Sequence, residues 1–441
     1  MAIKAIAQIQ PYRINTFGFN IPYMVRESSK LKEGGKTTVL GIQHVFAMFG
    51  STILVPILTG LPVSVALFCA GIGTLIFHLV TKGKVPVFLG SSFAFIAAIQ
   101  VVSATEGIEF ATGGIVAAGC VYLLLAVLVF FFGADRIRKL FPPVVTGPVV
   151  MIIGLMLAGT AISYFTNGWS YLVGVIVIAT VIIVSLFFKG FLKMLPILFG
   201  LIVGYISCMI LNAVGIDIGL NYAKITEAAF LTVPEFFLPA FSLSAILMIA
   251  PIAIVTFIEH LGDISANGAI VGKDFFKDPG LHRTLIGDGL ASIFAGLVGG
   301  PANTTYSENT GVLAATRNYN PRTLEIAAVF AIVISFIGYI SGFISSIPNA
   351  VLGGMCIVLF GMIASVGLRT LVENQVDFKN QRNVLIVGIM LIIAIGGLAI
   401  PIMPEADLYL SGVALSAVVG IILNLILPER LGKLDTDEKE E

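Results

Sequence analysis

The sequence predicts an all-α polytopic membrane protein with fourteen transmembrane spans, and its composition and hydropathy are the first observations behind this prediction. Only 11% of the 441 residues are Asp, Glu, Lys or Arg, whereas average usage is roughly 25%. Hydrophobic residues make up 57% of the chain, and the mean hydropathy is +1.02. So few charges cannot cover a soluble protein of this length, and most of its surface is therefore expected to face lipid. The 25 basic and 25 acidic residues balance without a basic block, so nucleic acid is not expected as a partner.

The spans follow from the lengths of the apolar runs, because a bilayer core about 30 Å thick requires roughly 20 apolar residues per helix. The first half contains seven such runs, at residues 39–58, 64–80, 86–104, 110–133, 141–163, 169–188 and 191–212. The second half contains seven more, at residues 243–265, 284–300, 303–316, 323–343, 346–366, 382–400 and 408–427. The predicted organisation is a cytoplasmic segment (1–38), a first seven-span repeat (39–212), an extracellular or periplasmic connection (213–242), a second repeat (243–427) and a cytoplasmic tail (428–441).

The distribution of Lys and Arg is the third observation, and it tests the number of spans independently, because cytoplasmic loops are enriched in these residues. If the N-terminus is placed in the cytoplasm, every Lys and Arg except Lys224 falls on the cytoplasmic side. Removing any one span would place the later loops on the wrong side. The sequence therefore predicts a multi-pass protein of the plasma (inner) membrane with both termini in the cytoplasm.

Two seven-span halves must be inverted relative to each other in the membrane, because seven is an odd number. The segment 141–147 resembles 347–353, and each segment opens the fifth span of its half. The third span of each half contains a short stretch of small and polar residues, at 90–95 in the first half and 299–309 in the second. Irregular backbone at membrane depth is tolerated where it is buried in protein or lines a cavity. Paired interrupted spans in two inverted halves are the best sequence indication of a transporter's central site.

Among the carboxylates inside the predicted spans, three are candidates for a functional role: Glu259, Asp263 and Glu308. Each costs about 2.5–3.5 kcal/mol at the bilayer centre on insertion scales, so such groups are usually functional. Glu259 and Asp263 are four residues apart and share one helix face. Glu308 lies in the interrupted tenth span, so acids from two spans are expected to meet near the midplane.

Structural roles remain open for these charges. Glu259 could bond a neighbouring Ser or Thr, Glu308 could cap a helix start, and Asp263 could lie at a solvated helix end. His260 faces away from Glu259 and reads as a packing residue, whereas Asp288 reads as a helix-start charge. Neither the acids nor the four isolated cysteines have the spacing of a metal site, and nothing indicates a cofactor or a catalytic nucleophile.

With these residues in hand, the chain resembles the nucleobase–ascorbate transporter (nucleobase:cation symporter) family, and within it the bacterial uracil permeases. Residues 308–317, Glu-Asn-Thr-Gly-Val-Leu-Ala-Ala-Thr-Arg, match the family signature [Gln/Glu/Pro]-Asn-x-Gly-x4-Thr-[Arg/Lys/Gly] throughout. Four further stretches look similar, at 43–50, 90–95, 278–283 and 303–306. The likeness spans roughly residues 38–428.

The resemblance implies a fold and a set of binding residues. Spans 1–4 and 8–11 would form a core domain, spans 5–7 and 12–14 a gate domain, and short antiparallel strands would interrupt spans 3 and 10. It also implies that Glu259 and Glu308 bind the base, that Phe93 stacks on it, and that Tyr306 lines the site. Ser307 is included because the backbone N–H groups of Phe93 or of the Tyr306–Ser307 stretch suit a substrate carbonyl.

Two departures from the uracil permeases leave the substrate open. Those proteins typically carry His at the position of Asp263 and Gly at the position of Ser307. An Asp there is typical of the purine-transporting branch, but that branch usually has Gln where this chain has Glu308. Uracil is therefore the expected substrate, and a xanthine or mixed permease is the alternative.

The expected mechanism is symport by alternating access. Ionised carboxylates accept hydrogen bonds from the two imide N–H groups of uracil, and Glu259, Asp263 or Glu308 would carry the coupling ion, a proton rather than sodium. The resemblance also implies a homodimer in the lipid bilayer. An anion transporter of related fold is the main rival. An intramembrane enzyme would need a nucleophile–base pair, and none is spaced for that. A channel is disfavoured, because two opposed acids at a broken helix suit occlusion of a substrate better than continuous conduction.

Overall fold

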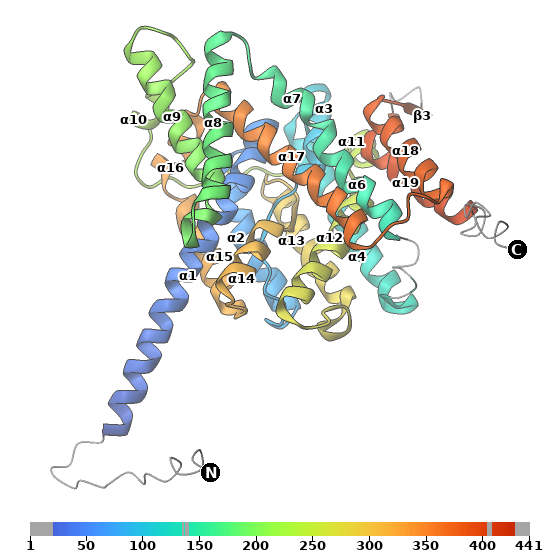
Figure 1. The fold of residues 1–441 in the computed structure, drawn as a ribbon, viewed down its shortest axis with the longest axis horizontal. Helices are drawn as coiled ribbons and strands as arrows, with labels where there is room; N and C mark the ends of the chain where they lie inside the picture. Colours follow the sequence, from blue (N-terminus) through green and yellow to red (C-terminus); the bar gives the residue numbers. More distant parts are fainter. Residues whose placement is uncertain (1–20, 135, 137–140, 404–407, 428–441) are drawn as a thin grey trace, which may run out of the picture.

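In the computed structural model, the structure describes residues 21–134, 136, 141–403 and 408–427, and the chain is mostly helical (Figure 1). The predicted cytoplasmic tail, 428–441, and the first 20 residues of the predicted N-terminal segment lie outside the described residues. The helices and strands of the first half, in chain order, are α1 (Ile21–Thr59), α2 (Val63–Val80), β1 (Leu89–Ser91), η1 (Phe93–Phe95), α3 (Ile96–Thr105), α4 (Ile108–Phe132), α6 (Pro143–Met156), α7 (Ala158–Ser163), α8 (Gly168–Phe187), η2 (Gly190–Met194) and α9 (Pro196–Ala213).

The second half follows a mostly irregular connection that carries the short helix α10 (Ala223–Thr226). Its elements are α11 (Leu243–Ile249), α12 (Ile252–Val271), η3 (Phe276–Gly280), α13 (Leu281–Leu297), β2 (Asn303–Thr305), α14 (Ser307–Thr316), α15 (Pro321–Ser335), α16 (Gly338–Ser345), α17 (Asn349–Glu373), α18 (Gln381–Ile395), β3 (Ala399–Met403), β4 (Leu408–Ser411) and α19 (Gly412–Ile426).

Eight helical segments within the described residues are long and apolar enough to cross a membrane. They are Thr37–Thr59, Val63–Val80, Ile108–Phe132, Pro143–Ser163, Gly168–Phe187, Pro196–Ala213, Leu243–Val271 and Asn349–Glu373. The chain is therefore a multi-pass membrane protein. Each of the fourteen predicted spans overlaps at least one helix, but several of these helices are short: α14 has 10 residues and α15 has 15.

The outer surface of several helices is apolar, as lipid contact requires. Phe131 on α4 is 74% exposed, and Leu186 on α8 is 70% exposed. Exposed apolar side chains on this scale would be a liability in water. They fit a protein whose surface faces hydrocarbon.

The helices pack in two groups, which lie on different sides of the body in Figure 1. In the first helix group, α2 packs on α13 and α15, α4 packs on α13, and α1 packs on α15. In the second helix group, α17 packs on α6 and α8, α8 packs on α9, and α18 packs on α19. Helices from distant parts of the sequence are thus neighbours within each group.

Two small sheets interrupt the helical architecture. β1 pairs antiparallel with β2, which confirms the pairing expected in spans 3 and 10. β3 pairs antiparallel with β4 between α18 and α19, where the sequence predicted the end of one span and the start of the next. Helix α18 ends at this point because Gly397 has φ 72°, a left-handed conformation that favours glycine.

Candidate functional site

The site is built around the β1–β2 pair, which joins the two halves of the chain. The register pairs Leu89 with Thr305, Gly90 with Thr304 and Ser91 with Asn303, and all six residues are buried. Helix η1 begins two residues after β1, and α14 begins two residues after β2. Because the pairing is antiparallel, the two helices begin at opposite ends of this short sheet. The N-terminal end of each helix, where free backbone N–H groups favour polar or anionic groups, therefore adjoins the sheet.

Close packing at Gly90 holds this sheet together. A Cβ atom at Gly90 would lie 2.3 Å from the ring of Tyr306, so only glycine fits beneath that ring. The Tyr306 hydroxyl donates a hydrogen bond of 2.9 Å to the Ser91 carbonyl. Tyr306, expected to line the site, is only 4% exposed, and its side chain spans the sheet.

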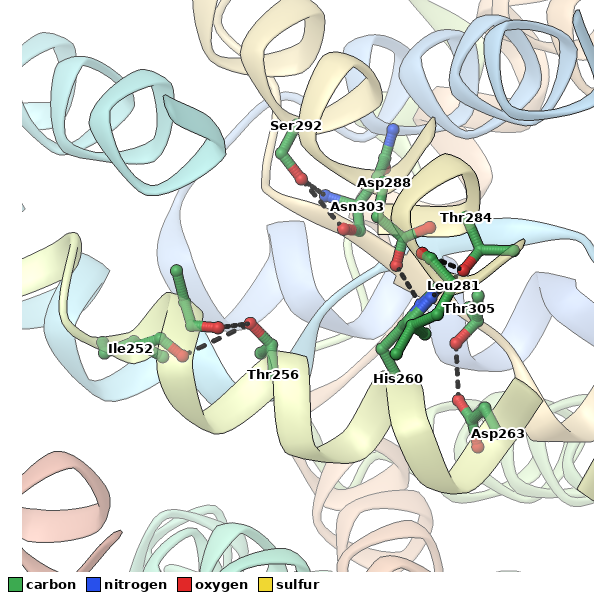
Figure 2. Close-up of polar contacts among 11 residues, drawn as sticks. Ile252, Thr256, His260, Asp263, Leu281, Thr284, Asp288, Ser292, Asn303 and Thr305 are labelled. Atoms are coloured by element: carbon green, nitrogen blue, oxygen red, sulfur yellow. Dashed lines mark hydrogen bonds and ion pairs between the residues drawn. The ribbon is translucent and has the colours of Figure 1, made fainter. Parts of the chain in front are cut away.

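The α13 helix anchors the second strand, as Figure 2 shows. The Ser292 hydroxyl donates to the Asn303 carbonyl at 2.9 Å and accepts from the Asn303 N–H at 3.1 Å. The Asn303 side chain in turn donates to the Cys69 carbonyl on α2 at 2.9 Å. These buried bonds fix where β2 lies relative to α2 and α13.

The three predicted acids come together in one cluster. Glu259 and Asp263 are one turn apart on α12, and both are half-buried. Glu308, also half-buried, is the second residue of α14, which packs against α12. Asp263 and Glu308 both lie close enough to Glu259 to interact with it electrostatically. The expected meeting of acids from two spans is therefore found in the structure.

Hydroxyl groups orient two of these carboxylates. The Thr305 hydroxyl of β2 donates to Asp263 Oδ2 at 2.7 Å, a contact drawn in Figure 2. The Ser51 hydroxyl of α1 donates to Glu308 Oε1 at 2.7 Å. Hydrogen bonds to a charged acceptor contribute about 1.5–3 kcal/mol, so both acids are held in defined directions.

Phe93 is the first residue of η1, close to the end of β1. It is half-buried and packs against both large apolar cores of the protein. Its ring makes an edge-on contact with Phe360 of α17, with centroids 6.2 Å apart. Phe93 also lines a cavity of about 370 Å³ whose other walls come from α3, α6, α11, α12, β3 and α19. Ser307, the remaining predicted binding residue, is exposed at the start of α14.

Several residues of the site were not identified from the sequence. Asn309 is buried and donates to the His44 carbonyl on α1 at 3.1 Å, and Asn267 donates to the Pro86 carbonyl at 2.8 Å. Asn309 and His44 lie in the recognised motifs, so membership of those motifs is the signal that could have found them. No comparable signal marks Ser51, which lies in an apolar helix.

The prediction for Asp288 was wrong. It lies well inside α13 rather than at a helix start, and its carboxylate contacts His260, as Figure 2 shows. The tertiary partner explains the difference, because a buried carboxylate requires a donor. Among the described residues, no group of three His, Cys, Asp or Glu side chains is placed to hold a metal ion.

Comparisons of this sequence with known proteins agree on one family. A family model described as "Permease family" matches residues 35–403. The chain is 45% identical to the uracil permease of Bacillus subtilis over 416 residues, covering 90% of this chain and 94% of that protein. It is 42% identical to a probable uracil permease of Haemophilus influenzae, covering 94% and 99%, and 37% identical to the uracil permease of Escherichia coli K12, covering 89% and 91%.

Solved structures show a similar fold at low sequence identity. The transmembrane domain of the cyanobacterial bicarbonate transporter BicA superposes with a TM-score of 0.61 at 15% identity, covering 88% of this chain and 97% of that chain. A murine solute carrier 26 family anion transporter in the inward-facing state superposes with a TM-score of 0.65 at 11% identity, covering 94% and 73%. At these identities the likeness concerns the fold alone.

Proposed function

This chain belongs to the nucleobase–ascorbate transporter family, a family of membrane permeases rather than enzymes, and from that premise we propose that it imports uracil by proton symport. The observation that carries the proposal is the cluster of Glu259, Asp263 and Glu308 beside the β1–β2 pair. Relatives named uracil permeases, at 37–45% identity over most of the chain, support the substrate.

The chemistry of the cluster suits a planar imide. Uracil presents two N–H donors and two carbonyl acceptors. Ionised Glu259 and Glu308 accept from the N–H groups, and backbone N–H groups near Phe93 or the Tyr306–Ser307 stretch donate to a carbonyl. The Phe93 ring supplies an apolar stacking face on one side of the base.

Proton coupling uses the same carboxylates. Glu259, Asp263 or Glu308 binds a proton together with the base on the outer side and releases it in the cytoplasm. The first helix group acts as a core domain that carries the site, and the second acts as a gate domain. Movement of one against the other gives alternating access, for which inverted repeats are a common basis. Phe93, which follows β1 and contacts Phe360 of the gate domain, lies at the moving boundary.

The proposed setting is the plasma (inner) membrane, with fourteen spans, both termini in the cytoplasm and two copies forming a homodimer. Sodium is the alternative coupling ion. A xanthine or mixed permease is the alternative substrate class, and Asp263 is the residue that favours it, because it departs from the uracil-permease pattern.

An anion transporter is the alternative that the shared fold raises. A site for an anion favours basic or neutral donors, because a buried carboxylate repels the substrate. Here three carboxylates interact at the centre. The charge of the site therefore supports a neutral substrate with N–H donors.

The test is uptake of labelled uracil by purified protein in liposomes, at two pH values, with and without sodium, and with unlabelled xanthine as competitor. Glu259→Gln and Asp263→Asn are compared with Asp278→Asn, a matched change at an exposed acid that pairs with Lys84. Glu259→Gln is expected to lower uptake at least tenfold, because losing one charge-assisted hydrogen bond costs about 1.5–3 kcal/mol. Uptake that is unaffected by an imposed proton gradient would exclude proton symport. Wild-type, pH-dependent accumulation in either site variant removes that residue from coupling.

A further inference from the structure

The cavity lined by Phe93 is apolar throughout, and the proposed function leaves it without a role. Its volume is about 370 Å³. Among the described residues, every side chain that lines it belongs to Phe, Ala, Val, Ile, Leu or Met, and the one further lining residue is Gly412. An engineered apolar cavity of about 150 Å³ is enough to bind benzene. The cavity is therefore large enough for an aromatic ring, and its side chains offer neither a charge nor a hydrogen-bond donor.

Phe93 joins this cavity to the proposed substrate site. Its ring is the proposed stacking face for the base, and the residue forms part of the cavity wall. Ile252 of α12 forms another part, seven residues before Glu259. This spacing places both side chains on one face of the helix, about 10 Å apart along its axis. The cavity therefore begins at the stacking residue and lies along the same face of α12 as the carboxylate.

Uracil has one polar edge and one apolar edge. The groups N1–H, C2=O, N3–H and C4=O follow one another around the ring, and the proposed site uses carboxylates and backbone N–H groups to bind them. The remaining edge, C5–C6, carries only C–H groups. Apolar surface gains free energy when it leaves water for an apolar environment. When the polar edge of the base faces Glu259 and Glu308, C5 and C6 are the positions from which a substituent can reach the cavity.

The cavity is bounded by both helix groups. Helices α3, α11 and α12 pack on α4 of the first helix group, whereas α6 and α19 belong to the second. Ala98 of α3 lines the cavity from the first side, and Val413 of α19 lines it from the second. In the proposed mechanism the two groups move against each other, so the shape of the cavity changes during transport. A ligand that fills it stabilises the arrangement of this structure, because it binds that arrangement more tightly than the others.

We propose that the cavity is a subsite for an apolar group at C5 or C6 of the pyrimidine ring, and that a uracil with an aromatic group there binds without being transported. The acids and Phe93 hold the base, while the aromatic group enters the cavity and contacts both helix groups. Such a ligand binds more tightly than uracil, because more apolar surface is buried, and it holds the two groups together. This inference rests on the proposed function, since it uses the same acids.

The affinity is tested by calorimetry of the purified protein with uracil, 5-benzyluracil, 6-benzyluracil and 1-benzyluracil. Burial of a phenyl group should lower the Kd of the 5- or the 6-benzyl compound about tenfold relative to uracil. 1-Benzyluracil carries the same group on the polar edge and lacks one N–H donor, so its Kd should exceed that of uracil. The subsite is refuted if neither C-substituted compound binds more tightly than uracil, or if 1-benzyluracil binds as tightly as they do. A protein that binds none of the four compounds refutes the proposed function instead.

The location is tested with Ala98→Phe, which fills the cavity from α3. The Kd of the tighter benzyluracil should rise at least tenfold, while the uracil Kd stays at its wild-type value. Val175→Phe, at a 62% exposed position on α8, should change neither Kd. If Ala98→Phe does not fold, Val413→Phe fills the cavity from α19 and is measured instead. A wild-type Kd for the benzyluracil in the folded cavity variant places the aromatic group elsewhere and overturns the proposal.

The block of transport is tested by exchange from liposomes loaded with labelled uracil. Unlabelled uracil added outside should speed the loss of label, because a transported substrate drives exchange. The tighter benzyluracil added outside should instead slow the loss below its rate without any ligand. Faster loss of label with the benzyluracil would mean that it is carried across, which contradicts the inference that it holds the two helix groups together.

Discussion

Replacing Gly90 with alanine tests whether the β1–β2 pair supports the site. The new Cβ atom would lie 2.3 Å from the Tyr306 ring, well inside ordinary van der Waals contact. The ring cannot move freely, because its hydroxyl is bonded to the Ser91 carbonyl at 2.9 Å. Either the strands separate or that bond breaks.

The magnitude follows from these two costs. Overpacking a buried position costs about 1–3 kcal/mol. A lost hydrogen bond that leaves buried partners unpaired adds about 1–3 kcal/mol. Gly90→Ala should therefore destabilise the protein by roughly 2–6 kcal/mol. It should also displace both Phe93 and Glu308, which follow the two strands. Uracil uptake is expected to fall at least tenfold.

The assay combines uptake in liposomes with the midpoint of thermal unfolding of the purified protein. Gly388→Ala on α18 is the matched control, because nothing lies within 4 Å of the new methyl group. Gly90→Ala combined with Tyr306→Leu should recover part of the lost stability, since the smaller side chain removes the clash. Wild-type stability and uptake in Gly90→Ala alone would refute the account of the sheet.

Two further predictions separate binding from stability. Ser51→Ala removes the hydroxyl that donates to Glu308 Oε1. Because a charge-assisted hydrogen bond contributes about 1.5–3 kcal/mol, the uracil Kd measured by calorimetry should rise about 10- to 150-fold. An unchanged Kd would show that Ser51 does not orient Glu308. Arg382→Gln on α18 affects a guanidinium that is 8% exposed and bonds the Leu427 and Asn424 carbonyls at the end of α19. Losing these hydrogen bonds to the end of α19 should lower the midpoint of thermal unfolding, while the uracil Kd of the remaining folded protein keeps its wild-type value. A change in Kd without a loss of stability would contradict a purely structural role for Arg382.

The sequence was informative wherever a residue conflicts with its local surroundings. Glu259 and Glu308 are visible because a carboxylate in an apolar segment is costly, and the structure brings them into one cluster. The small polar segments at 90–95 and 299–309 stand out for the same reason, and they include all of the β1–β2 pair except Leu89. Their roles in binding and coupling stay predictions.

Partners that are distant in sequence were not predictable. Ser51 and Glu308 are 257 residues apart, and His260 and Asp288 are 28 apart, so neither contact leaves a local pattern. The β3–β4 sheet was missed because Ala399–Met403 is as apolar as the end of a spanning helix. Periodicity reports which residues face the interior, but a hydrogen bond depends on which other helix is packed there.

The anchoring hydroxyls explain how the acids can be oriented and still bind a substrate. A carboxylate has two oxygens and about four lone pairs. Ser51 uses Oε1 of Glu308, and Thr305 uses Oδ2 of Asp263, so a second oxygen of each acid remains able to accept an N–H group. Because the anchors come from α1 and β2, the free oxygens are directed before any base arrives. Orientation of this kind reduces the entropy lost on binding, and it requires both halves of the chain to be folded together.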